Sequence, residues 1–197
     1  MFRPDVLILA AGASTRMRGA DKLLQLVGGV PLLTRITQAA VATGAPVTVA
    51  LPADSPLRWQ AIEGLPARTV VVTNPVLGMS HSLKTGLAAL SHASSVMLLL
   101  ADLPELTAAD LALMIATWRD DPDMILRGAA GSIPGHPVCL PAWLRPELLA
   151  LTGDQGARDV LQRHPDKTRL VALPDRHAVT DLDTPEDWAA WRGLSRQ

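Results

Sequence analysis

The sequence lacks tyrosine, has one phenylalanine and one cysteine, and contains neither a long apolar run nor an excess of charge. The single cysteine, Cys139, excludes an internal disulfide, and its place in an apolar run favours a core thiol over a nucleophile. Apolar stretches such as residues 96–101 are far shorter than the roughly 20 residues of a membrane-spanning helix. With 18 Lys and Arg against 19 Asp and Glu, no overall field favours nucleic acid or an anionic membrane, so we expect neither as a partner.

The apolar content is nevertheless large enough to bury a core. At 197 residues, 48% of them hydrophobic, the chain fits one domain over residues 1–197. The first residues, MFRPDVLILAAG, show no charged segment followed by a cleavable small-residue site, so we expect a cytoplasmic protein. Trp188 and Trp191 are spaced as on one helix face, which favours packing roles for both.

Short apolar runs alternate with helical patterns along the chain. Residues 6–10, 47–51, 70–72 and 96–100 read as strands buried on both faces, and residues 31–43, 80–91 and 108–118 read as helices, with Pro31 and Thr107 at their starts. This repeated βα pattern predicts a doubly wound α/β fold, a mostly parallel sheet flanked by helices in three layers. Residues 128–137 are rich in Gly and Pro, and we interpret them as a loop entering a smaller subregion, about residues 128–165.

The first predicted strand leads into a loop of small residues that ends in two cations, Arg16 and Lys22. Small side chains let main-chain N–H groups approach a triphosphate, and the cations neutralise it. The loop is neither the Gly-x-Gly-x-x-Gly fingerprint nor a Walker loop. An ordinary βα turn with two solvated cations is the plain alternative.

A second candidate segment covers residues 74–87. Gly78 permits a tight turn, and Ser80 and Ser82 flank a helix start where hydroxyl and free N–H groups can read a pyrimidine edge. The alternative is simple helix capping by Ser80. His81, between the serines, fits a surface residue better than a general base.

Carboxylates follow the fourth apolar run and recur near the C-terminal end of the sequence. Asp102 is placed at the carboxyl edge of a central strand, where open α/β sheets bind their ligands. Mg²⁺ is commonly held by one or two carboxylates together with substrate phosphates, so a second acid is expected. Asp181 and Asp183 can supply it, but both precede a helix start, and the residues alone leave capping and metal binding equally favoured.

Three strings together carry a family resemblance. LAAGASTRMRGADKLL, residues 9–24, resembles the signature loop of the nucleotidyltransferases that include molybdenum cofactor cytidylyltransferase and guanylyltransferase, although Arg18 stands where that family usually has Gly. GMSHSLKTGL, residues 78–87, resembles the nucleobase segment of the cytidylyl branch, and LADLP and DLDTPED resemble the metal motifs, with Leu103 where Gln or Met is common. The resemblance implies nucleotide contacts by Ala10, Ala11, Gly12, Arg16, Lys22, Asn74, Gly78, Ser82 and Gly86, and metal contacts by Asp102 with Asp183 or Asp181.

The resemblance extends to GHPV, residues 135–138, and GDQGAR, residues 153–158, which border the acceptor in that family. It implies acceptor contacts by His136 and Arg158; a guanidinium is suited to clamping a phosphate. The implied fold is Rossmann-like, and the implied cofactor is Mg²⁺.

The implied reaction is transfer of a nucleotidyl group, with CTP the first choice, to molybdopterin with release of pyrophosphate. Arg16, Lys22 and Asp102 would act on the reacting phosphates by charge and position, and the product would pass in a transient contact to a molybdoenzyme or its chaperone. The alternatives are a guanylyltransferase using GTP, another cytidylyltransferase or sugar-phosphate nucleotidyltransferase, and, outside the enzymes, a module that binds or delivers a nucleotide cofactor.

Overall fold

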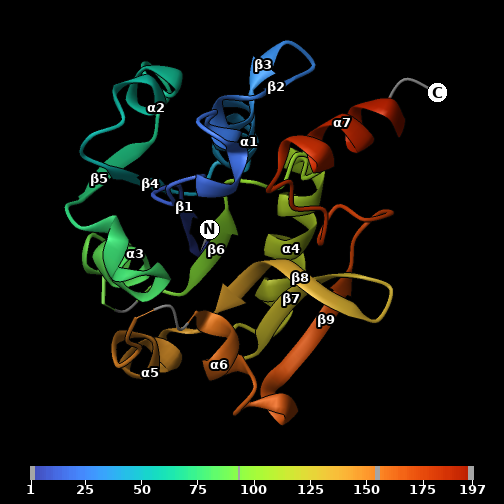
Figure 1. The fold of residues 1–197 in the computed structure, drawn as a ribbon. Coiled ribbons are helices and arrows are strands. Elements are labelled where there is room, and N and C mark those ends of the chain that lie inside the picture. Colours follow the sequence, from blue (N-terminus) through green and yellow to red (C-terminus); the bar gives the residue numbers. More distant parts are fainter. Residues whose placement is uncertain (1–2, 93, 154–155, 195–197) are drawn as a thin grey trace.

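A computed structural model describes residues 3–92, 94–153 and 156–194, and its centre is a twisted sheet (Figure 1). Within these residues the strand order is β5-β4-β1-β6-β8-β7-β9. Strands β5, β4, β1 and β6 are parallel, whereas β8 runs antiparallel to both β6 and β7. The strand bounds are β1 Asp5–Leu9, β4 Val47–Pro52, β5 Arg68–Val72, β6 Val96–Leu100, β7 Ile125–Ala130, β8 Ile133–Leu140 and β9 Thr168–Ala172, with a separate hairpin of β2 Leu26–Val27 and β3 Val30–Pro31.

Helices cover both faces of the sheet, which confirms the predicted three-layer α/β/α fold. One face packs against α1 and α4 through a core that includes Val6, Ile8, Ile36 and Trp118. The other face packs against α3, α5 and α6 through a core that includes Leu7. Alternate residues of one strand thus enter different cores. The α-helices are α1 Leu32–Ala42, α2 Pro56–Ala61, α3 Met79–Ala88, α4 Ala108–Asp120, α5 Arg145–Leu149, α6 Ala157–Leu161 and α7 Pro185–Leu194.

The four predicted strands and three predicted helices are present, with ends shifted by up to three residues. Their apolar runs are continuous because both faces are covered: every residue of β4 is buried. Thr107 caps α4 as predicted, since its hydroxyl accepts from the Asp110 N–H at 3.2 Å while the Asp110 carboxylate accepts from the Thr107 N–H at 2.8 Å. Cys139 is a core thiol, and burial raises its pKa to about 12.

The prediction of a loop over residues 128–137 is wrong. These residues lie in β7, in β8 and in the turn at residues 131–132 that joins them, and the two strands pair antiparallel with a register shift between Arg127 and Ala129. The glycines mark close backbone approach: a Cβ at Gly128 would lie 2.6 Å from the His136 carbonyl oxygen, and one at Gly135 would collide with the Ala178 carbonyl. The Gly and Pro content therefore reflects crowding inside the sheet.

The last helix, α7, returns over the sheet edge at which the first strand ends (Figure 1). Trp188 is buried and its ring meets that of Trp191 edge-on at 6.0 Å, which confirms packing roles for this pair. Trp188 and Leu182 form a small core with Met17 and Leu32. This core ties the segment before α7 to the loop after β1. Among the described residues, no helix is long and apolar enough to cross a membrane.

Candidate active site

The candidate site lies at the point where the strand order of the sheet reverses, between β1 and β6. From β1 the chain continues to β4 and β5 on one side, while β6 pairs with the other side of β1. Such a switch point leaves a crevice at the carboxyl ends of the strands. A cavity of about 300 Å³ occupies it, between the segment after β1 and the segment after β6. Its lining consists of Leu9, Ala10, Ala11, Gly12, Lys22, Leu23, Pro75, Gly78, Met79, Ser82, Leu100, Ala101 and Asp102.

The loop after β1 owes its shape to left-handed backbone turns. Ser14 and Arg18 both have φ of 52°, a conformation that favours glycine, and they flank a short 3-10 helix at Thr15–Met17. Arg18 stands at the position where the family's signature loop usually has Gly. Here Arg18 adopts the left-handed conformation despite its side chain, which forms an exposed ion pair with Glu186 at 2.8 Å.

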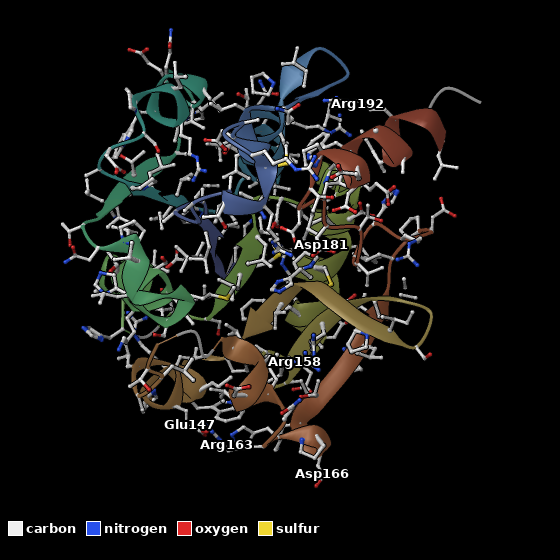
Figure 2. The ribbon with its side chains drawn as sticks, in the orientation of Figure 1. Glu147, Arg158, Arg163, Asp166, Asp181 and Arg192 are labelled. Carbon is white, nitrogen blue, oxygen red and sulfur yellow. The ribbon has the colours of Figure 1, made fainter. Side chains whose placement is uncertain are left out.

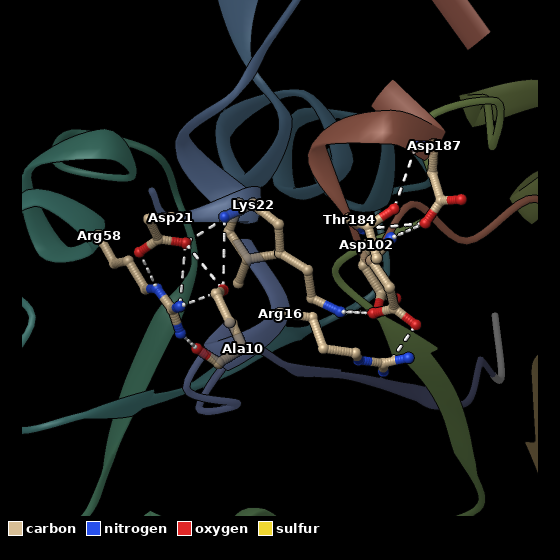
Figure 3. Close-up of polar contacts among 11 residues, drawn as sticks. Ala10, Arg16, Asp21, Lys22, Arg58, Asp102, Thr184 and Asp187 are labelled. Atoms are coloured by element: carbon tan, nitrogen blue, oxygen red, sulfur yellow. Dashed lines mark hydrogen bonds and ion pairs between the residues drawn. The ribbon is translucent and has the colours of Figure 1, made fainter. Parts of the chain in front are cut away.

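Lys22 is the centre of the charged cluster (Figure 3). Its Nζ donates to Asp102 Oδ2 at 2.5 Å and to Asp183 Oδ1 at 2.7 Å. Burial opposes the charge on Lys22, but the two carboxylates outweigh it, so the pKa of Lys22 is raised above its usual value. The exposed guanidinium of Arg16 adds an ion pair to Asp183 Oδ2 at 2.7 Å. Residues from three separate motifs thus meet at one point.

Asp183 is available to Lys22 because another acid caps α7. The Asp187 carboxylate accepts from the N–H of Thr184 at 2.9 Å and of Asp183 at 3.2 Å, and the Thr184 hydroxyl accepts from the Asp187 N–H at 3.1 Å. The hydrogen bonds from Thr184 lower the pKa of Asp187. Asp181 is exposed and lies outside the Lys22 cluster. Of the two acids proposed as the second ligand, Asp183 is the one beside Asp102.

The carboxylates offer ligand positions that suit a divalent metal. Asp102 Oδ1 is buried and has no hydrogen-bond partner, while Oδ2 is held by Lys22. Carboxylate oxygens are the hard donors that such ions prefer. The described residues contain no cluster of three or more His, Cys, Asp or Glu side chains able to hold a metal. Asp102 and Asp183 therefore fit a metal that is also held by the phosphates of a substrate.

Arg58 is a site residue that the sequence did not predict. It is 3% exposed and comes from α2, yet its guanidinium binds Asp21 twice, at 2.6 and 2.9 Å. It also donates to the Ala10 carbonyl at 2.7 Å and to the Ser14 hydroxyl at 3.2 Å (Figure 3). Asp21 in turn accepts from the Leu23 N–H at 2.9 Å. No motif marks Arg58, since its role arises only from the packing of α2.

The predicted nucleobase segment lies partly in the cavity. Gly78, with φ of 90°, is the N-cap residue that precedes α3, and both Gly78 and Ser82 line the cavity. The alternative that Ser80 caps this helix is wrong, because its hydroxyl donates to the Gly153 carbonyl at 2.7 Å and α3 has no side-chain cap. Gly86 lies outside the cavity lining, where it lets α3 approach the sheet: a Cβ there would lie 2.6 Å from the Leu7 side chain.

The predicted acceptor residues lie together in a second, smaller cavity. His136 of β8 and Arg158 of α6 line a space of about 190 Å³, whose wall shares Met79 and Leu100 with the first cavity. Figure 2 shows Arg158 beside α6, well apart from Asp181 on the segment before α7. Burial lowers the pKa of His136 to about 4, so its ring is neutral at physiological pH. Asp154 and Gln155 of the predicted GDQGAR segment lie outside the described residues.

The predicted residues are thus distributed over three groups. The first cavity is lined by Ala10, Ala11, Gly12, Lys22, Gly78, Ser82 and Asp102. Arg16 and Asp183 join this group through ion pairs. His136 and Arg158 line the second cavity, whereas Asn74, Gly86 and Asp181 lie outside the lining of both.

Comparisons with known proteins identify the family of the chain. Residues 6–168 match the model of the MobA-like NTP transferase domain. Two curated relatives named probable molybdenum cofactor guanylyltransferase align over nearly their whole length. The one from Synechococcus elongatus is 31% identical over 93% of this chain and 95% of its own, and the one from Nostoc sp. is 28% identical over 95% and 89%.

The solved structures show the same fold. A crystal structure from Mycobacterium sp. strain JC1, of a homologue of a Mycobacterium tuberculosis protein, superimposes with a TM-score of 0.83 at 26% identity, covering 98% of this chain and 96% of that one. The matched region contains the loop after β1, the carboxylate after β6 and the β7–β8 hairpin. The chain therefore belongs to the MobA-like NTP transferase family and is a nucleotidyltransferase.

Proposed function

We propose that this protein transfers the nucleotidyl group of a nucleoside triphosphate to molybdopterin, with Mg²⁺ as the metal and GTP as the nucleotide. The observation that carries the transfer is the bridge that Lys22 makes between Asp102 and Asp183 at the mouth of the nucleotide cavity. The choice of molybdopterin as the acceptor and of GTP as the nucleotide rests on the names of relatives that align over nearly the full chain. The contact with a molybdoenzyme or its chaperone stays a prediction.

The loop and its cations act on the triphosphate. The segment Ala11–Gly12 brings main-chain N–H groups to the cavity without bulky side chains in the way. Lys22, close to the carboxylates, neutralises charge at the α-phosphate, and the exposed Arg16 reaches the outer phosphates. An oxygen of the acceptor phosphate attacks the α-phosphorus, the bond between the α-phosphorus and the bridging oxygen breaks, and pyrophosphate leaves with the electron pair.

Asp102 and Asp183 would hold the metal, since Asp102 Oδ1 is buried and lacks a partner. When bound there, Mg²⁺ would supply positive charge that offsets the charge of the triphosphate and of the leaving pyrophosphate. No side chain forms a covalent intermediate in this scheme, and Cys139 lies in the core with its pKa raised to about 12 by burial. Positioning and electrostatics therefore supply the rate enhancement.

CTP is the second candidate nucleotide, and two observations favour it. The segments around Ala11 and Ser82 resemble the cytidylyl branch, and both residues line the cavity. A volume of about 300 Å³ is small for a ligand pocket. A pyrimidine base is smaller than a purine and so suits such a space better.

Pyrophosphate release tests both the reaction and the base. The purified protein is incubated with Mg²⁺, molybdopterin and each of GTP, CTP, ATP and UTP in turn, with Asp102→Asn as the inactive control. We expect release with GTP to exceed the others by about 10-fold or more, as a pocket built for one base's hydrogen bonds predicts. A preference for CTP would replace GTP by the second candidate. Absence of release with all four would favour a binding or delivery module.

A further inference from the structure

The second cavity contains a cation that the sequence resemblance did not mark. Arg127 of β7 lines it together with His136 and Arg158. The remaining described lining residues are apolar or glycine, so no carboxylate among the described residues lines this cavity. The half-buried Arg127, the exposed Arg158 and the neutral His136 thus line one cavity beside the nucleotide cavity.

Within the part of the chain that the structure describes, no acidic side chain pairs with Arg127. Its Nε is buried without a hydrogen bond, and the described residues form no ion pair with Arg127 or Arg158. Burial lowers the pKa of Arg127, and the nearby charge of Arg158 lowers it further. Half-buried arginines are normally paired, because desolvating a charge without compensation costs free energy. An anion that enters the cavity and accepts hydrogen bonds from Arg127 and Arg158 would compensate this cost.

His136 connects this cavity electrostatically with the reaction centre. Its Nδ1 is buried without a hydrogen-bond partner, which leaves a polar position open to a ligand. The ring is close enough for the charges of both Arg127 and Asp102 to act on it. The cavity also shares the side chains of Met79 and Leu100 with the nucleotide cavity. An anion held by the arginines would therefore lie beside the nucleotide cavity.

We infer that Arg127 and Arg158, with His136, form the site for the phosphate monoester of the acceptor, placing its oxygen for attack on the α-phosphorus. This inference rests on the proposed function for the identity of the ligand, but the anion site itself does not. A phosphate dianion suits the site because two guanidinium groups can each offer paired N–H donors to its oxygens. Arg127 is then a binding residue for the acceptor.

Thermal unfolding with inorganic phosphate as the probe tests the anion site directly. The midpoint of the wild-type protein should rise with phosphate concentration, since a ligand that binds only the folded state stabilises it. In Arg127→Gln and in Arg158→Gln we expect the apparent phosphate affinity to fall by about 10-fold or more. Arg169→Gln is the matched control, because Arg169 is exposed on the adjacent strand β9, opposite Leu126. It should keep the wild-type phosphate affinity.

The stability of the phosphate-free variants separates binding from a structural role. Arg127→Gln removes like-charge repulsion and an unpaired buried group, so its midpoint without phosphate should equal or exceed that of the wild type. A structural Arg127 would instead lower the midpoint, and Arg127→Lys would restore it. Phosphate affinities of Arg127→Gln and Arg158→Gln within twofold of the wild type would overturn the anion site.

Steady-state kinetics test the assignment to the acceptor. With molybdopterin as the varied substrate, Arg127→Gln should raise KM by about 10-fold or more, while KM for the nucleotide stays within twofold. Stronger effects on nucleotide KM or on inhibition by pyrophosphate would assign the anion to the leaving group and overturn the inference. Loss of phosphate affinity in the variants, with no transfer by the wild type to any acceptor, would retain the anion site and reject the proposed function.

Discussion

Buried Arg58 and partly exposed Asp21 form a doubly hydrogen-bonded ion pair, with nitrogen–oxygen distances of 2.6 and 2.9 Å, behind the loop that carries Lys22. The same guanidinium donates to the Ala10 carbonyl at 2.7 Å. Arg58 therefore fastens the beginning of the loop to its end. A triphosphate then meets main-chain groups that are already in place, which reduces the ordering cost of binding.

Breaking this pair should weaken nucleotide binding. Arg58→Met leaves the Asp21 carboxylate without its partner, and we expect a loss of about 3 kcal/mol in the free energy of unfolding. KM for the nucleotide should rise by about 10-fold with a smaller change in kcat, because Arg58 acts through the loop. The double variant Arg58→Met/Asp21→Leu should recover part of the stability but keep the raised KM. Wild-type nucleotide KM in both variants would remove Arg58 from the positioning of the loop.

Asp102→Asn should nearly abolish turnover while the protein stays folded. The substitution removes the charge that Lys22 and the metal require, at a position beyond the end of β6 and outside the sheet hydrogen bonds. We expect kcat to fall by about 100-fold or more. Circular dichroism should show the wild-type secondary structure. Activity within a few-fold of the wild type would show that Asp102 has no part in the reaction.

Asp183 and Asp181 provide a matched pair that identifies the second carboxylate. Asp183 contacts Lys22 and Arg16, whereas Asp181 is exposed two residues earlier. Asp183→Asn should raise the Mg²⁺ concentration needed for half-maximal activity by about 10-fold or more, and Asp181→Asn should change it by less than about twofold. A stronger effect at Asp181 would exchange their roles.

His136 should give the stability a measurable pH dependence. Burial lowers its pKa to about 4, with the charge of Arg127 adding to the effect and the Leu98 carbonyl and Asp102 opposing it. Between pH 6.5 and 4 the unfolded chain binds a proton that the folded chain does not, so the free energy of unfolding falls as the pH is lowered through this range. His136→Gln should reduce that fall in urea titrations. If the free energy of unfolding of His136→Gln changed with pH as in the wild type, another group would be responsible for the pH dependence.

The central strands of the sheet could be predicted because their burial is visible in the sequence. Strands such as Val96–Leu100 are buried on both faces, so their apolar runs are unbroken, and Thr107 carries a local cap signal. The β7–β8 hairpin could not be predicted in this way. Gly128 and Gly135 stand there because the backbones of His136 and Ala178 approach closely, and such contacts leave the same mark in sequence as a loop.

The site was predictable where its residues lie within motifs and unpredictable where tertiary contacts create it. Asp102 follows a strand that locates it, but Arg58 lies on a short helix with no local sign of its partner Asp21. Arg127 reads as an ordinary charged residue on a strand until Arg158 is seen to share its cavity. The contact of Lys22 with Asp183, while Asp181 is exposed, likewise depends on tertiary structure.

The most direct test of the central claim follows labelled phosphorus from the nucleotide that gives the highest rate in the pyrophosphate assay. With molybdopterin and Mg²⁺, label at the α-phosphate should appear in the acceptor product, and label at the γ-phosphate should appear only in pyrophosphate, at equal rates. Both signals should be lost in Asp102→Asn. Transfer of the γ-label to the acceptor, or its release as inorganic phosphate, would contradict nucleotidyl transfer to molybdopterin.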